Sequence, residues 1–120
     1  MKEIPKIHEG EYRFCLILWE NEPIHSAKLA QLCNEQLGWS RTTTYTIIRR
    51  LTDRGVVKSE NAIVSAVIKK EEVQLREMDE MMEKTFEGSL PAFIAAFARR
   101  QKLSDKDVEE LRRLIEQGGK

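Results

Sequence analysis

Three segments in the first half of the chain carry apolar residues with the spacing of a helix. The residues from His8 to Glu20 are broadly apolar and predict a core helix, which Asn21-Glu22-Pro23 then breaks. A second helix is expected from Ala27 to Leu37, opened by Ser26 and stopped by Gly38. The third helix follows after only a short turn, which is typical of a helix-turn-helix pair.

The third helix, from residue 41 to 54, has both ends marked and two distinct faces. Ser40 can cap its first amide groups, and Gly55 can take the left-handed conformation that ends a helix. With about 100° of rotation per residue, one face is mainly apolar and comprises Thr44, Ile47, Ile48 and Leu51. The opposite face is polar and comprises Thr42, Thr46, Arg49 and Asp53, with Thr43 and Arg50 on one flank. We therefore expect hydroxyl and guanidinium groups to point outward.

Threonine is unusually frequent at the start of this helix. It occupies four of the five positions from 42 to 46, each at a cost of roughly 0.5 kcal/mol relative to alanine. Threonine and arginine on the N-terminal half of a helix can contact base edges and phosphates in the major groove of DNA. Alternatively, tertiary packing carries the helix and the threonines are ordinary surface residues.

The period changes after Gly55, where β-branched residues become frequent. Val56-Val57 and the segment from Ile63 to Ile68 predict the two strands of a hairpin, with the polar Lys58-Ser59-Glu60-Asn61 between them. The hairpin follows the third helix directly, as the wing does in a winged helix-turn-helix. We assign residues 1–69 to such a domain.

Three further helices are expected from Lys70 onward. The first carries an apolar stripe that ends at Gly88, the second starts at Ser89-Leu90-Pro91, and the third is capped by Ser104. The predicted fold class is mainly α with a small β-hairpin: a winged helix-turn-helix followed by a C-terminal helical dimerisation region, residues 70–120.

The C-terminal region is too small to bury enough apolar surface by itself. A second copy of the chain would cover its apolar stripe, while a ligand pocket and purely intrachain packing are the alternatives. The residues assigned to dimerisation are Leu75, Met78, Met82, Phe86, Phe93, Phe97, Leu111 and Ile115. A two-fold homodimer would present two recognition helices to two half-sites.

Charge is balanced over the whole chain but not along it. The 20 basic residues equal the 20 acidic ones, so net charge alone gives no case for nucleic-acid binding. From residue 39 to 58 there are five basic residues and one acidic residue, whereas from 71 to 90 there are seven acidic and two basic residues. The basic segment 39–58 and the acidic segment 71–90 would orient the molecule on a polyanion, with the basic segment toward it.

The sequence has no set of residues typical of catalysis or metal binding. Without a glycine-rich phosphate loop, a Ser/His/Asp set or a metal-ligand cluster, we expect no enzyme activity, no cofactor and no metal site. His8 and His25 are expected at the surface or as caps, with Cys15 and Cys33 buried and reduced. Because neither a long apolar run nor a signal-peptide core is present, we expect a cytoplasmic location without membrane insertion.

The chain resembles the penicillinase-repressor (BlaI/MecI) family in the motif Trp39-Ser40-x-x-Thr43-x-x-Thr46-x-x-x-Arg50-Leu51-x-x-x-Gly55. The likeness runs from Ile4-Pro5 to beyond Leu103-Ser104, and so over nearly the full chain. The resemblance implies a dimeric winged-helix repressor that sits on a palindromic operator in double-stranded DNA and blocks transcription. Antibiotic-resistance or stress genes would be its targets.

The resemblance also implies roles for single residues of the third helix. Thr43 and Thr46 match contacts in the groove, and Arg50 matches a contact to phosphate. Arg41 and Thr42 stand where the family varies, which makes them candidates for choosing the operator.

In relatives that respond to β-lactams, a membrane-linked sensor and protease system leads to cleavage of the repressor at an Asn-Phe bond. The matching pair here is Ala96-Phe97, the candidate cleavage site, in which Phe is kept and Asn is not. Copper-responsive relatives carry C-terminal Cys-x-Cys motifs, whereas this chain has no cysteine after Cys33.

Two functions follow from the sequence. The first is operator binding, with the DNA-binding set Arg41, Thr42, Thr43, Thr46, Arg49, Arg50, Arg54 and Lys58. The alternative is a winged-helix module that binds another protein and not DNA. The balanced net charge and the acidic segment 71–90 favour this alternative.

Overall fold

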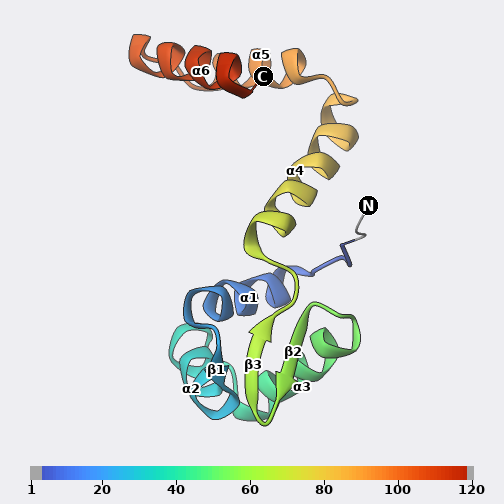
Figure 1. Ribbon diagram of the computed structural model, residues 1–120. Helices are drawn as coiled ribbons and strands as arrows, with labels where there is room; N and C mark the ends of the chain where they lie inside the picture. Colours follow the sequence, from blue (N-terminus) through green and yellow to red (C-terminus); the bar gives the residue numbers. More distant parts are fainter. Residues whose placement is uncertain (1–3, 119–120) are drawn as a thin grey trace. The chain divides into compact units, whose positions relative to one another are not determined.

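A computed structural model of the protein describes residues 4–118 (Figure 1). Its helices are α1 (Glu9–Asn21), α2 (Ser26–Leu37), α3 (Arg41–Asp53), α4 (Lys70–Phe86), α5 (Leu90–Arg100) and α6 (Asp105–Gly118). Its strands are β1 (Ile24–His25), β2 (Val57–Glu60) and β3 (Ile63–Ala66). The mainly helical fold with a small sheet is thus confirmed. The chain forms two compact units, which meet in sequence between Glu77 and Met78.

The wing is part of a three-stranded antiparallel sheet with the order β1-β3-β2. The expected hairpin is confirmed as β2 and β3, and β1 adds a third strand that the sequence did not predict, because two residues leave no period. Residues 58–60 belong to β2 and not to the connection, since this part of the strand is exposed and tolerates polar side chains. The turn consists of Asn61 and Ala62 alone, with φ of 51° and 65°, the pair of positive values that a type I′ turn requires.

The helix ends form where the sequence predicts them. Ser40 caps α3 by accepting a hydrogen bond from the amide of Thr43 at 3.1 Å, and Gly55 beyond the helix has a φ of 78°. Further caps are His25 for α2, Ser89 for α5 and Ser104 for α6. These ends place the boundaries of α3 and hence the outward position of its side chains.

The first unit has one hydrophobic core, to which α1, α2, α3, the sheet and the base of α4 contribute. Phe14 and Leu18 of α1 and Leu51 of α3 are 0% exposed, and Val73 of α4 is 1% exposed. Because Val73 lies in this core, the unit reaches to Glu77 and does not end at residue 69, where the sequence suggested a boundary.

The second unit has no such core. From residue 78 to 118 the structure describes no buried side chain, and several large apolar residues are exposed. The exposed fraction reaches 63% for Leu114 and 68% for Ile115. Three helices with such a surface lack the buried area that stabilises a small domain on its own.

Glu11 forms a buried ion pair that joins the start of α1 to the end of α3. Its Oε1 lies 2.6 Å from Nη2 of Arg54 and also accepts a hydrogen bond from the amide of His8 at 3.0 Å. Burial opposes ionisation of Glu11, but the hydrogen bonds from His8 and Arg54 and the guanidinium charge outweigh it, so the pKa of Glu11 is lowered. The carboxylate therefore stays charged and holds both elements.

We predict that Glu11→Gln destabilises the protein by about 1–3 kcal/mol at neutral pH, because Arg54 is left partly buried without its anion. Since the folded pKa of Glu11 lies below its unfolded value, the stabilisation is present above the unfolded value and is lost as the pH falls through the folded one. Urea unfolding at several pH values measures this, and the two proteins should converge in acid.

The matched control is Glu9→Gln. Glu9 forms an exposed pair with Arg13 on the same helix, with side chains 82% and 62% exposed, so this change should alter stability by less than about 0.5 kcal/mol. Equal effects of the two substitutions, or a difference that does not depend on pH, would show that the buried pair does not stabilise the fold.

Candidate nucleic-acid interface and dimerisation surface

Helix α3 has an apolar face in the core and a polar face toward solvent. Thr44, Ile48 and Leu51 are buried, with 0%, 7% and 0% of their surfaces exposed. The exposed residues of the helix include Arg41, Thr42, Thr43, Arg49, Arg50 and Asp53, while Thr46 is half-buried. The two faces predicted from the helical period are confirmed. Of the four threonines at positions 42 to 46, Thr44 is thus a core residue, whereas the other three reach the surface.

Side chains of the turn between α2 and α3 hold the start of α3. The Ser40 Oγ atom that caps the helix lies 2.9 Å from Oγ1 of Thr43. Asn34 donates from Nδ2 to the carbonyl oxygen of Trp39 at 2.9 Å, and the Trp39 ring stacks on Phe14 with an interplanar angle of 4°. The first turn of α3 is therefore positioned by the core and by α2, and not by its own weak helix propensity.

Tyr45 is a residue that the sequence interpretation missed. Arg41 donates from Nε to the Tyr45 hydroxyl at 3.2 Å, and its Cζ lies 5.6 Å from the centre of the ring. The i,i+4 spacing of the two residues is the signal that would have found the pair. Tyr45 itself packs against the core, so it gives the exposed Arg41 a defined position at the start of the helix.

Arg54 is held inside the protein by Glu11 and is only partly exposed, with 34% of its side chain accessible. The sequence predicts that Arg54 meets phosphate, but its guanidinium already has a buried anion as partner. Its geometry suits a residue that fixes the C-terminal end of α3. Lys58 of β2, by contrast, is exposed and lies just beyond that end in sequence.

The buried cysteines carry no sign of metal or redox chemistry. Burial raises the pKa of the Cys15 thiol to about 12 and also raises that of Cys33. Both are free thiols in the core. Across residues 4–118 we find no group of three His, Cys, Asp or Glu residues suited to a metal ion. In the same range, no helix combines the length and the apolar character that crossing a membrane requires.

The second unit exposes apolar side chains on α5 and α6. A groove of about 440 Å³ between these helices is lined by Ile94, Leu103, Val108, Leu111, Arg112, Ile115 and Glu116. Among the residues assigned to dimerisation, Leu75, Met78, Phe97, Leu111 and Ile115 are exposed, and Met82, Phe86 and Phe93 are half-buried. The Phe93 ring packs edge-on against Phe86, with 5.4 Å between the ring centres. These exposed side chains leave a surface that another protein surface can cover.

Ala96 and Phe97 lie inside α5, in its C-terminal half, and the carbonyl oxygen of Phe97 accepts the hydrogen bond from the amide of Gln101 that ends the helix. Proteases act on extended backbone, so cleavage of this bond would require α5 to unfold locally. Ala96 is half-buried in the structure.

Comparisons with known proteins agree over almost the whole chain. The family model described as Penicillinase repressor matches residues 7–117. The methicillin resistance regulatory protein MecI of Staphylococcus aureus (strain Mu50 / ATCC 700699) is 23% identical over 114 residues, which cover 92% of this chain and 93% of that protein. The penicillinase repressor of Bacillus licheniformis is 20% identical over 121 residues, covering 98% of this chain and 94% of that protein.

Among solved structures, the chain is similar to the solution structure of Bacillus licheniformis BlaI in its monomeric form, in complex with the blaP half-operator. The TM-score is 0.52 at 22% identity, over 60% of this chain and 93% of that chain. This likeness supports the winged-helix fold. Because the family model spans nearly all of the described residues, the chain belongs to the penicillinase-repressor family, whose members are transcriptional regulators and not enzymes.

Proposed function

We propose that the protein is a homodimeric repressor that binds a palindromic operator through α3. The outward face of α3 supports this role, because exposed threonine and arginine side chains lie there, opposite a buried apolar face. Such a face matches the chemistry of a DNA major groove, in which hydroxyl and guanidinium groups contact base edges and phosphates. The similar BlaI structure contains a half-operator, which supports the same role for this chain.

Within this proposal the residues of α3 divide by their position along the helix. The N-terminal half of α3 reads the groove through Arg41, Thr42, Thr43 and Thr46. Arg49, Arg50 and Lys58 neutralise phosphates near its C-terminal end. Arg54 acts indirectly, because its ion pair with Glu11 positions that end of the helix.

A second copy of the chain is the partner that best suits the second unit. No residue from 78 to 118 is buried in the single chain, and a dimer would cover the exposed residues of α4, α5 and α6. A two-fold dimer also supplies two copies of α3 for two half-sites. The operator sequence would determine which genes the repressor controls. Partner proteins would supply the signal that releases it, including a membrane-linked sensor and protease system of the kind implied by the family.

We predict that Arg50→Ala weakens binding to all DNA sequences alike. If a dimer engages six to eight phosphates, the logarithm of affinity falls against the logarithm of salt concentration with a slope of roughly −5 to −7. The variant should flatten this slope by about one for each phosphate that it no longer neutralises. Fluorescence anisotropy with duplex DNA at several salt concentrations measures it. Arg100→Ala, at the end of α5, is the control with an unchanged slope, and an unchanged slope for Arg50→Ala would show that Arg50 neutralises no phosphate.

We predict that Thr42→Ala and Arg41→Gln change the preferred DNA sequence more than they change affinity for random DNA. A side chain that reads a base discriminates by about 1–3 kcal/mol, or roughly five- to 150-fold. Competition between the selected site and single-base variants measures this preference. A uniform loss across all sequences would instead assign these two residues to the phosphate backbone.

We predict that Leu111→Glu converts the dimer to a monomer, because it places a charge in the apolar surface of α6. Light scattering should report half the wild-type mass, and affinity for a palindrome should fall toward that for a half-site. Glu109→Ala on the same helix is the control and should leave the mass unchanged. A wild-type chain that is monomeric at every concentration would contradict the assignment of this surface to dimerisation.

A further inference from the structure

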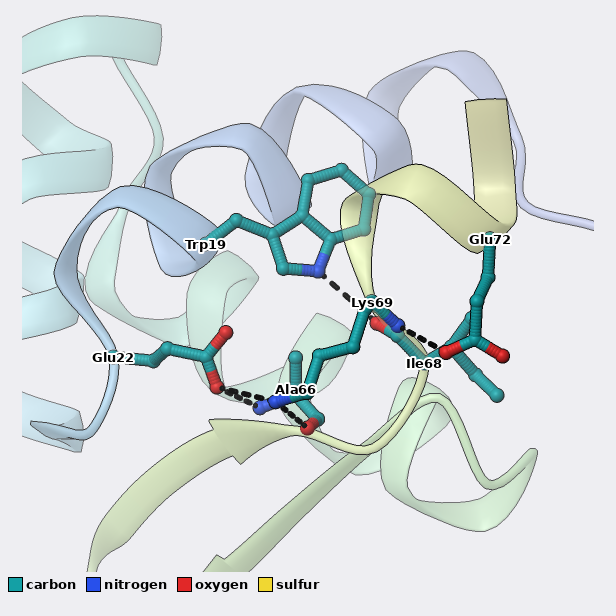
Figure 2. Close-up of polar contacts among 6 residues, drawn as sticks. All are labelled: Trp19, Glu22, Ala66, Ile68, Lys69 and Glu72. Atoms are coloured by element: carbon teal, nitrogen blue, oxygen red, sulfur yellow. Dashed lines mark hydrogen bonds and ion pairs between the residues drawn. The ribbon is translucent and has the colours of Figure 1, made fainter. Parts of the chain in front are cut away.

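Side chains near the end of α1 hold the segment that leads from the wing into α4. This segment, residues 67–69, connects the end of β3 to the start of α4, and its backbone is contacted from α1 (Figure 2). Neither α3 nor the polar residues assigned to DNA contact take part in these interactions. The arrangement therefore needs an explanation apart from groove reading.

The attachment consists of one hydrogen bond that Trp19 donates and one that Glu22 accepts. Trp19 donates from Nε1 to the carbonyl oxygen of Ile68 at 3.1 Å. Glu22 accepts through Oε1 a hydrogen bond from the amide of Ala66 at 2.8 Å. Figure 2 shows the indole and the carboxylate, separated by one turn of chain, reaching two points of the same short stretch of backbone.

Lys69 takes part in the same junction, the segment from Ala66 to the start of α4. Its Nζ donates to the carbonyl oxygen of Ala66 at 3.0 Å and lies 3.5 Å from Oε1 of Glu22. Its amide donates to Oε1 of Glu72 at 3.0 Å, which caps the first turn of α4. Lys69 thus forms both the ion pair with Glu22, the residue that follows α1, and the hydrogen bond that caps the start of α4.

The base of α4 is also packed into the core. Ile68 is 2% exposed and Val73 is 1% exposed, so the apolar side chains on both sides of Lys69 are buried in the first unit. Glu22 has only 18% of its side chain exposed, which strengthens its hydrogen bonds relative to those of a surface pair. These contacts leave little freedom at the point where α4 begins.

This restriction matters for a dimer that binds two half-sites. A flexible connection would let the two winged helices adjust to many separations, whereas a fixed connection allows few. In the proposed dimer, α4 runs from the winged helix into the region assigned to dimerisation, so its base is the connection in question.

We propose that Trp19, Glu22 and Lys69 are positioning residues that fix the base of α4 on the winged helix and so select the spacing between half-sites. This inference rests on the proposed function of the chain as a dimeric operator-binding repressor. These three residues would then contribute to specificity without being assigned to DNA contact. Helix α3 would read each half-site, and the junction would set the distance between the two half-sites.

The test uses full-length protein with the double substitution Trp19→Phe and Glu22→Ala, which keeps an aromatic ring but removes both hydrogen bonds to the backbone. The probes are an isolated half-site and palindromes whose spacer is lengthened or shortened by two base pairs. The half-site and its natural spacing come from selection of wild-type binders from random DNA. Lys69→Ala is the milder second variant, and Glu20→Ala, exposed on the same helix, is the control.

We expect wild-type affinity to drop about tenfold or more when the spacer is changed, because half-sites must keep their helical phase. In the double variant this penalty should shrink to about threefold or less, with half-site affinity unchanged within about twofold. The control should keep the wild-type penalty. An unchanged penalty in the double variant and in Lys69→Ala, or an equal loss on half-site and palindrome, would overturn the inference.

Amide hydrogen exchange provides a readout that does not depend on DNA. Exchange at residues 66–73 should be at least about tenfold faster in the double variant than in the wild type, since the junction opens locally. Unchanged exchange would overturn the inference even if the protein binds operators as proposed. Failure of the wild type to bind any DNA, with exchange accelerated as expected, would instead refute the proposed function and with it the role in spacing.

Discussion

The burial of the apolar face of α3 is the constraint on which the rest of the molecule depends. Ile48 and Leu51 are almost fully buried in the core, and burial of such side chains contributes about 1.5–3 kcal/mol each. The four threonines at positions 42 to 46 cost the helix about 2 kcal/mol in propensity, which this burial offsets. Because this burial stabilises α3, the outward face need not consist of good helix formers and can carry hydroxyl and guanidinium groups. The Glu11–Arg54 pair and the Ser40 cap then hold the two ends of the helix in place.

Features with a regular period or a local signal were predictable from the sequence. The faces of α3, its cap and its glycine end follow from 3.6-residue spacing and from the chemistry of single residues, and the structure confirms them. The C-terminal helices were predictable for the same reason, with Ser89 and Ser104 marking two of their starts. The apolar stripes of these helices predicted a dimerisation surface, and this stays a prediction: five of the eight assigned residues are exposed in the single chain, and Met82, Phe86 and Phe93 are half-buried.

Contacts between residues far apart in sequence were not predictable, because no local sequence pattern indicates which residues will meet. Glu11 was one of many acidic residues, and only the fold places it 2.6 Å from Arg54. The same holds for Trp19 and Glu22, whose partners Ile68 and Ala66, between the end of β3 and the start of α4, lie more than 40 residues away. Strand β1 was missed since two residues carry no period, and Tyr45 was missed although its i,i+4 spacing to Arg41 was visible.

If the outward face of α3 lies in the DNA groove, as we propose, chemical-shift mapping will locate the contact on that face. The measurement is titration of isotope-labelled protein with a duplex that the wild type has selected from random DNA. We predict that the largest changes fall on residues 40–50 and on Lys58. Changes confined to α4, α5 and α6, or no change at any DNA concentration at low salt, would contradict it.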